Sequence, residues 1–234
     1  MDLIEKNDNE NRHPWELSRI NSLVKEINKY HTKGDVLDIG CGDSFFDYQL
    51  LEKNKNINKL YGIDIYTKEE YTDHNYIVIN NYDKLKNKKF DTIIMLDVIE
   101  HIEDDYDFLE NTVKKLLKND GKVIITVPAY QFLFGKHDIE LKHFRRYNLK
   151  MIRKLCDKTS FKIKKAHYFY ASLVLPRLMS KLLNKDDRIN NWKYSKNHIL
   201  TKLFEGILNL DYFICKKLNK LSFGLSLFVV IERK

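Results

Sequence analysis

The chain has 234 residues, enough for one α/β domain with added helices. Its three cysteines lie far apart and form no C-x-x-C pair, which argues against a disulfide framework or a zinc knuckle and indicates a reducing, cytoplasmic location. The net charge of +8 comes from dispersed lysines and does not indicate a particular partner. The first residues are polar, and no run of about 18 apolar residues occurs, so we expect neither a secretion signal nor a membrane span.

The first predicted element is a helix over residues 13–30. Pro14 suits the first turn of a helix, and apolar side chains from Trp15 to Ile27 recur at helical spacing. We expect this helix to cover the edge of a ligand site, as part of an N-terminal helical cap over residues 1–33.

The next segment is the most informative one. A predicted strand at 35–39 ends in the turn Gly40-Cys41-Gly42, and a second predicted strand at 59–63 is followed by Asp64. A Gly-x-Gly turn lets a ligand lie against bare backbone, and an acid about 20 residues further on can bind a ribose diol. The sequence therefore predicts a nucleoside-binding site.

The charges around this turn indicate which nucleoside binds. A dinucleotide fingerprint has a third glycine where this chain has Phe45. Asp38 and Asp43 flank the turn, so we expect them to repel a pyrophosphate and to favour a cation. S-adenosylmethionine carries an ammonium and a sulfonium group and no phosphate.

The two motifs resemble those of the class I S-adenosylmethionine-dependent methyltransferases. The resemblance implies S-adenosylmethionine as cofactor, S-adenosylhomocysteine as product, and Asp64 as the ligand of both ribose hydroxyls. Asn81 stands where the family has an acid that contacts the adenine amino group, and an amide oxygen can accept the same hydrogen bond. The implied cofactor-binding residues are Trp15, Asp38, Gly40, Cys41, Gly42, Phe45, Asp64, Ile65, Asn81, Tyr82, Leu96, Asp97 and His101.

Strands and helices alternate along the rest of the chain. This alternation predicts an α/β fold, with a Rossmann-like, doubly wound, seven-stranded and mostly parallel sheet. About 55 residues separate the last two strands, more than a crossover needs, so we expect a helical insertion over 171–220 within a single domain of residues 1–234. The further strands are predicted at 76–79, 90–96, 121–127, 161–170 and 226–232, and the further helices at 45–53, 104–117, 150–158, 171–183 and 198–218.

Asp97, Glu100 and His101 follow the fourth predicted strand. Their main interpretation is a helix start that packs on the cofactor, without a metal. The alternative is a divalent metal site, since the three side chains lie one turn apart and a later histidine such as His137 could add a fourth ligand. Similar arrangements are found in metal-dependent relatives that methylate RNA 3′ ends and in some quinone-pathway O-methyltransferases.

The loop over residues 128–147 follows the fifth predicted strand, and such loops form the site of an open α/β sheet. One of its two histidines could act as general base, and its two arginines could hold an anionic substrate group. In the alternative, the arginines pair with Asp138 or Glu140 and the histidines only cap or pack. The candidate catalytic residues are His137, His143, Arg145, Arg146 and Tyr147.

Several short motifs recur in one subgroup of these methyltransferases, which is associated with surface-polysaccharide and glycan pathways. They are Val-Pro-Ala at 127–129, His-Asp at 137–138, His-x-Arg-Arg-Tyr at 143–147 and Phe-Gly-x-Ser-Leu at 223–227, with His13 and Trp15 at the start. The resemblance implies O-methylation of a sugar hydroxyl on a glycan, nucleotide-sugar or lipid-linked precursor. The alternatives are a metal-dependent RNA 2′-O-methyltransferase, a quinone-type O-methyltransferase, and a cofactor-binding protein without catalysis.

The predicted helix at 171–183 is apolar with basic residues between the apolar ones. It could rest on a membrane surface or a polyprenyl chain, or it could be a lid or a dimer face with a packed apolar stripe. A nucleic-acid partner is disfavoured but stays open, and the sequence predicts no oligomeric state.

Overall fold

The computed structural model describes residues 12–67, 69–183, 198–217 and 223–234. The polar stretch at 184–197, inside the predicted insertion, lies outside the described residues, as does most of the predicted N-terminal cap before the first helix.

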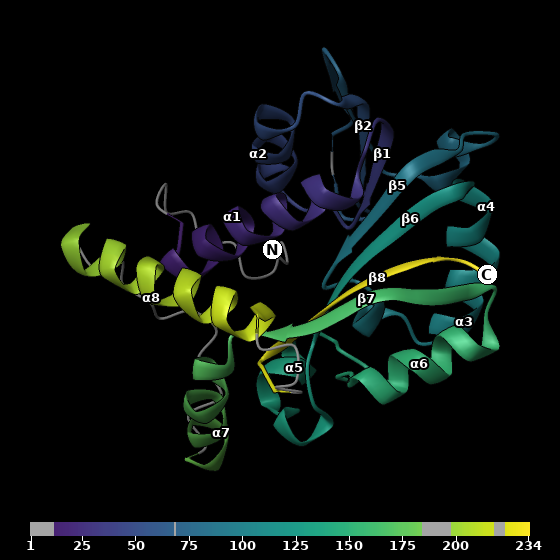
Figure 1. Ribbon diagram of the computed structural model, residues 1–234. Helices are drawn as coiled ribbons and strands as arrows, with labels where there is room; N and C mark the ends of the chain where they lie inside the picture. The colour runs from purple at the N-terminus through teal and green to yellow at the C-terminus, as the bar shows by residue number, and fades with distance from the viewer. Residues whose placement is uncertain (1–11, 68, 184–197, 218–222) are drawn as a thin grey trace.

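An eight-stranded sheet forms the centre of the described chain, in the order β3-β4-β2-β1-β5-β6-β8-β7 (Figure 1). Six strands run parallel, while β3 and β8 run antiparallel to their neighbours. The predicted α/β, doubly wound fold is confirmed. The strands are β1 (Gly34–Ile39), β2 (Ile57–Ile63), β3 (Tyr71–Asp73), β4 (Tyr76–Ile79), β5 (Phe90–Leu96), β6 (Leu117–Pro128), β7 (Phe161–Phe169) and β8 (Ser226–Arg233).

The sheet has one strand more than the seven predicted. The additional strand is β3, a three-residue edge strand whose side chains are all exposed and which pairs with β4 through a tight turn. Three exposed residues show no alternation between buried and exposed positions, so the pattern that predicts the other strands is absent here.

Helices cover both faces of the sheet (Figure 1). On one face, α1 and α2 pack on a cluster that includes Leu23, Ile27 and Leu50; on the other, α6 and the segment after β5 pack on a cluster that includes Leu109 and Ile152. The helices are α1 (Pro14–Tyr30), α2 (Phe45–Lys53), α3 (Asp105–Asp107), α4 (Lys114–Leu116), α5 (Lys136–Glu140), α6 (Leu149–Lys158), α7 (Val174–Leu182) and α8 (His198–Lys217).

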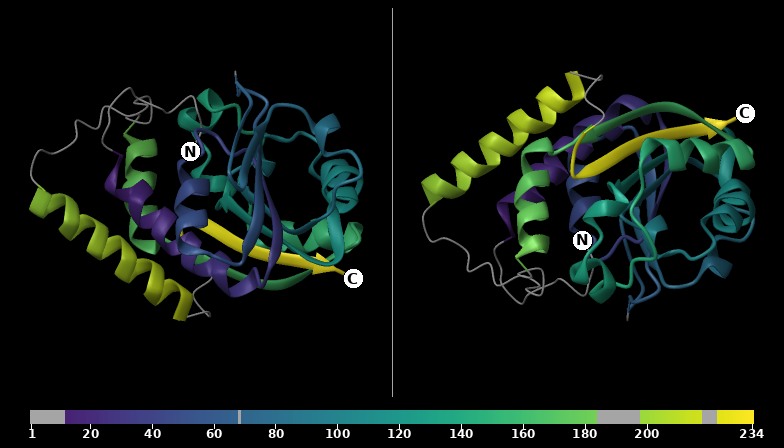
Figure 2. Two further views of the ribbon diagram at one scale, coloured as in Figure 1. Left: turned by 90° about the horizontal axis from the view of Figure 1, so that it is seen from above. Right: turned by 90° about the horizontal axis from the view of Figure 1, so that it is seen from below.

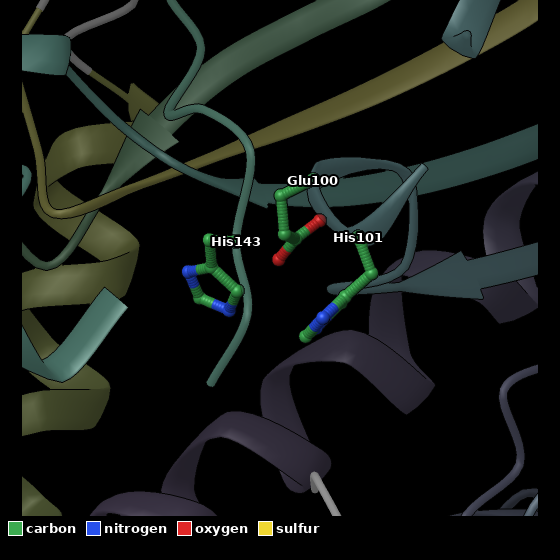
Figure 3. Close-up of side chains that lie close together, drawn as sticks. All are labelled: Glu100, His101 and His143. Carbon is green, nitrogen blue, oxygen red and sulfur yellow. The ribbon is translucent and has the colours of Figure 1, made fainter. Parts of the chain in front are cut away.

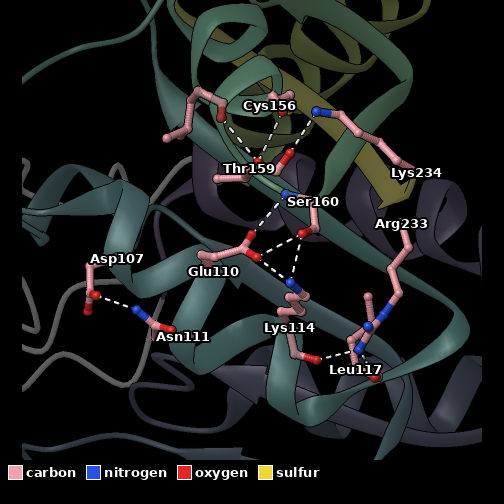
Figure 4. Close-up of polar contacts among 11 residues, drawn as sticks. Asp107, Glu110, Asn111, Lys114, Leu117, Cys156, Thr159, Ser160, Arg233 and Lys234 are labelled. Carbon is pink, nitrogen blue, oxygen red and sulfur yellow. Dashed lines mark hydrogen bonds and ion pairs between the residues drawn. The ribbon is translucent and has the colours of Figure 1, made fainter.

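The single helix predicted at 104–117 is divided. It begins as α3, continues as a π-helical segment at Phe108–Val113 and ends as α4, and Leu117 already belongs to β6. Glu110, in the π-helical segment, accepts hydrogen bonds from the backbone N–H and the hydroxyl of Ser160 at 2.8 and 2.7 Å, and Arg233 donates to the carbonyl of Leu117 at 2.6 Å (Figure 4). These contacts tie the segment to the start of β7 and to the C-terminus, on the side of the sheet away from the glycine turn.

The segment after β7 returns to the first face of the sheet. Helix α8 lies along α1, as both views in Figure 2 show, and Lys216 forms an ion pair with the buried Glu26 of α1. Asp211 of α8 accepts hydrogen bonds from the backbone of Ala171 and Ser172 at 3.1 and 2.9 Å. The predicted insertion is therefore attached to the sheet through α8, whereas α7 projects from it.

Both helices after β7 expose apolar side chains at helical spacing. On α7 these are Leu175, Met179 and Leu182, and on α8 they include Leu203, Ile207 and Leu210. Among the described helices, none has the length and the apolar character that crossing a bilayer requires.

Candidate active site

The glycine turn lies at the carboxyl end of β1, where the strand order of the sheet reverses between β1 and β5. Gly40 and Gly42 have φ angles of 78° and 57°, values that side chains disfavour. A Cβ atom on Gly40 would also lie 2.7 Å from the Cγ2 atom of Val98. Glycine at position 40 is therefore required both by the backbone angle and by the contact with the segment after β5.

Asp64 joins the turn to the end of β2. One carboxylate oxygen accepts a hydrogen bond from the N–H of Gly42 at 3.0 Å, and the other accepts from the N–H of Tyr66 at 2.9 Å. Each carboxylate oxygen has a second lone pair, so Asp64 can still accept two hydroxyl donors.

The other two acids near the turn do not present free charge. Asp43 forms an ion pair with Arg12, and Asp38 is buried beside Asp47. Burial, and next the charge of Asp47, raises the pKa of Asp38 well above its usual range. The expectation that Asp38 and Asp43 surround the turn with negative charge is therefore wrong, because one is paired and the other favours its neutral form.

A cavity of 650 Å³ opens beside the turn and extends to the loop after β6. This volume is within the range of about 300 to 1,000 Å³ that is usual for small-molecule sites. The predicted site residues that line it are Trp15, Gly40, Cys41, Asp64, Ile65, Tyr82, Leu96, Asp97, Glu100, His101, His137, His143 and Arg146.

Other predicted site residues do not line this cavity. They are Asp38, Gly42, Phe45, Asn81, Arg145 and Tyr147. Arg145 forms an ion pair with Asp105 at 2.9 Å, and Tyr147 donates to the same carboxylate at 2.7 Å. Both residues therefore attach the loop at 128–147 to α3 and not to the cavity. Asn81 is exposed and accepts a hydrogen bond from the N–H of Asp83 at 2.9 Å.

Asp97 occupies a strained position at the end of β5, with a φ angle of 56°. Its carboxylate forms an ion pair with Arg19 of α1 at 2.5 Å and accepts from the hydroxyl of Thr126 at 3.1 Å. These contacts direct Asp97 toward α1.

Glu100, His101 and His143 form a second cluster in the cavity, and Figure 3 shows their side chains pointing toward one another. One ligand atom from each lies within 4.8 Å of the others. Glu100 is fully buried, and neither carboxylate oxygen has a hydrogen-bond partner among the described residues. Burial, and next the charge of Asp97, raises the pKa of Glu100 well above its usual range.

This cluster differs from the metal set predicted as an alternative. Glu100 and His101 belong to both sets, but His143 takes the place of Asp97 and His137. Both replaced residues line the same cavity, but Asp97 pairs with Arg19. The sequence could not distinguish the two histidines, because which of them faces Glu100 depends on how the chain turns between His137, in α5, and His143, after it.

Asp138 forms a hydrogen bond with the His143 side chain. The Nδ1 atom of His143 lies 2.9 Å from Oδ1 of Asp138, and Arg146 donates to the same oxygen at 2.7 Å. Burial would raise the pKa of Asp138, but the hydrogen bond with His143 and the charge of Arg146 outweigh it and hold the pKa well below its usual range. Arg146 thus pairs with Asp138, as the structural alternative above expected.

Sequence reasoning missed three arginines of the cavity wall. Arg12 precedes α1, Arg19 lies in the second turn of α1, and Arg177 comes from α7. For Arg177 the only signal was a basic residue in an apolar segment, and no spacing rule connects it with Asp138, which lies 39 positions earlier.

Residues 12–194 match a family model described as a methyltransferase domain. A ubiquinone biosynthesis O-methyltransferase of Rickettsia canadensis is 29% identical over 119 residues, which are 47% of this chain and 50% of that relative. A protein of the same name from Rickettsia prowazekii is 25% identical over 222 residues, covering 87% of this chain and 81% of the relative.

Solved structures share the fold at lower identity. The phosphoethanolamine N-methyltransferase 2 of Haemonchus contortus, in complex with S-adenosyl-L-methionine, has a TM-score of 0.52 and 21% identity, and the match covers 91% of this chain and 52% of that one. The plantazolicin methyltransferase BpumL has a TM-score of 0.55 and 13% identity, with 94% and 85% covered. The match to the Rickettsia canadensis relative spans half of its length.

Proposed function

Because the chain belongs to the methyltransferase-domain family, we propose that it transfers a methyl group from S-adenosylmethionine to a hydroxyl group of an aromatic acceptor. One observation carries this proposal: a single cavity joins the glycine turn and Asp64 to His143. The Nδ1 atom of His143 forms a hydrogen bond with the buried carboxylate of Asp138.

The turn suits this cofactor. The bare backbone at Gly40 allows close approach, and Asp64 can accept both ribose hydroxyls. The Asp64 carboxylate lines the cavity and favours a cationic ligand, whereas Glu16 and Asp97 of the same wall pair with Arg12 and Arg19. When bound, S-adenosylmethionine supplies an electrophilic methyl group and leaves as S-adenosylhomocysteine.

The acceptor end of the cavity favours an aromatic ring. Apolar side chains line it beside the histidines, among them Ile102, Phe108, Leu141 and Phe144. The curated relatives named above are O-methyltransferases of ubiquinone biosynthesis, which corresponds to the quinone-type alternative. The sugar hydroxyl predicted from the glycan-associated motifs is the competing acceptor, and no relative named above has a glycan in its name.

His143 is the residue that we assign to the acceptor hydroxyl. The carboxylate of Asp138 fixes the proton on Nδ1, so that Nε2 carries the lone pair. In that tautomer His143 can take the hydroxyl proton while Asp138 stabilises the charged ring, as a general base requires.

A specific observation also supports a divalent cation at Glu100, His101 and His143. Buried carboxylate oxygens normally have partners, and both oxygens of Glu100 lack one among the described residues. A ligating histidine commonly donates its other N–H to a carboxylate, as His143 does. A cation held there would occupy the Nε2 lone pair of His143, so this histidine would then be a ligand in place of a base, and the cation itself would lower the pKa of the acceptor hydroxyl.

The test is methyl transfer measured by mass spectrometry with catechol or methyl glucoside as acceptor, with EDTA or Mn²⁺ added. We expect catechol to be methylated; methylation of the glucoside alone would contradict the aromatic acceptor. We expect Mn²⁺ to stimulate transfer and Glu100→Gln to remove the stimulation, with Glu103→Gln, at an exposed neighbour, as the matched control. Transfer that EDTA leaves unchanged would contradict the cation and leave the O-methyl transfer intact.

A further inference from the structure

We propose that Arg177 is a positioning residue for His143, acting through Asp138, so that helix α7 forms part of the active site. The inference rests on the role of His143 given above. It adds to the active site a residue from the segment between β7 and β8. This segment is remote in sequence from the loop at 128–147.

Asp138 is fully buried and receives a donor in each of four positions. Its Oδ1 atom accepts from His143 and Arg146, and its Oδ2 atom accepts from the N–H of Gly135 at 2.9 Å and from Arg177 at 3.1 Å. A carboxylate has about four lone-pair sites, so this set fills them. Because both oxygens are bound by two donors each, the orientation of the carboxylate plane is fixed.

The two oxygens have different tasks. Oδ1 faces His143 and sets its tautomer, whereas Oδ2 is held by Gly135 and Arg177. Without the guanidinium, Oδ2 would keep one backbone donor, and the carboxylate could rotate about the Cβ–Cγ bond. Rotation would move Oδ1 away from Nδ1 of His143, and the Nε2 lone pair would lose its fixed direction.

Helix α7 is placed for this role by a second contact with the same loop. Lys181, one helical turn after Arg177, donates to the backbone carbonyl of Phe132 at 2.7 Å. Two cationic side chains of one helix thus bind the loop that carries Asp138 and His143. Figure 1 shows α7 beside α5 below the sheet.

The contact of Arg177 is directional as well as electrostatic. Arg146 already neutralises Asp138, so charge alone does not require a second guanidinium. A guanidinium donates in a fixed plane, which suits the orientation of a carboxylate. Arg177 also lines the cavity, so its effect is exerted next to the acceptor.

The experiment compares Arg177→Met, Arg177→Lys and the wild type, with Arg153→Met at an exposed position of α6 as the matched control. The first readout is the nitrogen-15 NMR signature of the His143 ring, which reports its tautomer and its Nδ1–H hydrogen bond without any acceptor. The second is kcat and KM for methyl transfer to catechol. A purely structural role of Arg177 would leave the His143 signature unchanged in a folded variant.

We expect Arg177→Met to lose the single-tautomer signature and to lower kcat by about 10 to 100-fold, with little change in KM for S-adenosylmethionine. Arg177→Lys should restore both only in part, because its ammonium keeps a charged donor but lacks the fixed plane of the guanidinium. If Arg177→Met does not fold, Arg177→Gln provides the same comparison with an uncharged donor.

An unchanged His143 signature and unchanged kcat in Arg177→Met would overturn the inference. If the wild type transfers no methyl group to any acceptor tested, the proposed function fails, and the NMR comparison alone decides the role of Arg177. If transfer occurs and the signature does not respond to Arg177, the function stands and the positioning role does not.

Discussion

A guanidinium nitrogen of Arg19 in α1 lies 2.5 Å from the carboxylate of Asp97 at the end of β5. The same guanidinium donates to the hydroxyl of Thr126 in β6 at 2.8 Å. One buried side chain thus connects the first helix with two strands whose carboxyl ends border the cavity.

Replacing Arg19 by Met should loosen α1 over the cavity. Removal of a charge-assisted contact leaves the Asp97 carboxylate without its ion-pair partner, so we expect a loss of about 1–3 kcal/mol in the free energy of unfolding. Urea denaturation measures this, and affinity for S-adenosylhomocysteine should fall as well. Lys25→Met, at an exposed position of the same helix, is the control. Equal stability of the two variants would show that the Arg19 contact does not hold α1.

Replacing His143 by Gln tests which histidine serves the acceptor. Loss of a positioned base typically costs about 10² to 10⁴-fold in rate, so kcat should fall by at least the lower figure while KM for S-adenosylmethionine stays nearly unchanged. His74→Gln, in the exposed turn between β3 and β4, should behave as the wild type. A large loss in His137→Gln with normal turnover in His143→Gln would assign the role to the other histidine of the loop.

The acids beneath the glycine turn make stability depend on pH. Asp47 accepts from the hydroxyl of Tyr76 at 2.5 Å, and burial raises its pKa to about 7, against the lowering effect of hydrogen bonds with Tyr76 and Asp38. Since the folded pKa lies above the unfolded value, the folded state binds more protons between the two values. The stabilising contribution of protonated Asp47 is thus complete below about pH 4 and is lost as pH rises through about 7.

Asp47→Asn should therefore gain stability relative to the wild type as pH rises from about 4 to about 7. Thermal unfolding across this range measures the difference. Asp38, Asp43 and Tyr76 act on the pKa of Asp47, Asp47 acts on that of Cys41, and these four groups remain in the variant. A difference that does not change with pH would contradict the raised pKa of Asp47.

The strands and the turn could be predicted because local patterns determine them. Buried strands such as Phe90–Leu96 have continuous apolar runs, and the bounds predicted for that strand agree with the structure. The turn at Gly40 is recognisable because only glycine suits its backbone and its contact with Val98. Strand β3 escaped prediction because its side chains are exposed and its pairing depends on β4 alone.

Side-chain partners could be predicted less well because they depend on distant segments. Asp43 looks like a free acid in sequence, but Arg12 pairs with it. Arg145 and Arg146 are adjacent and look equivalent, but one faces Asp105 and the other Asp138. The acceptor and the peripheral membrane contact stay predictions, since none of the contacts described above involves a partner.

Calorimetric titration of the purified protein with S-adenosylhomocysteine, repeated with Asp64→Asn and with Asp73→Asn as an exposed control, decides whether this cavity binds the cofactor. We expect one binding site, weakened by about 1–3 kcal/mol in Asp64→Asn because two charge-assisted hydrogen bonds to the ribose are impaired, and unchanged in the control. No binding to the wild type, or equal affinity in all three proteins, would contradict the assignment of this cavity to the cofactor.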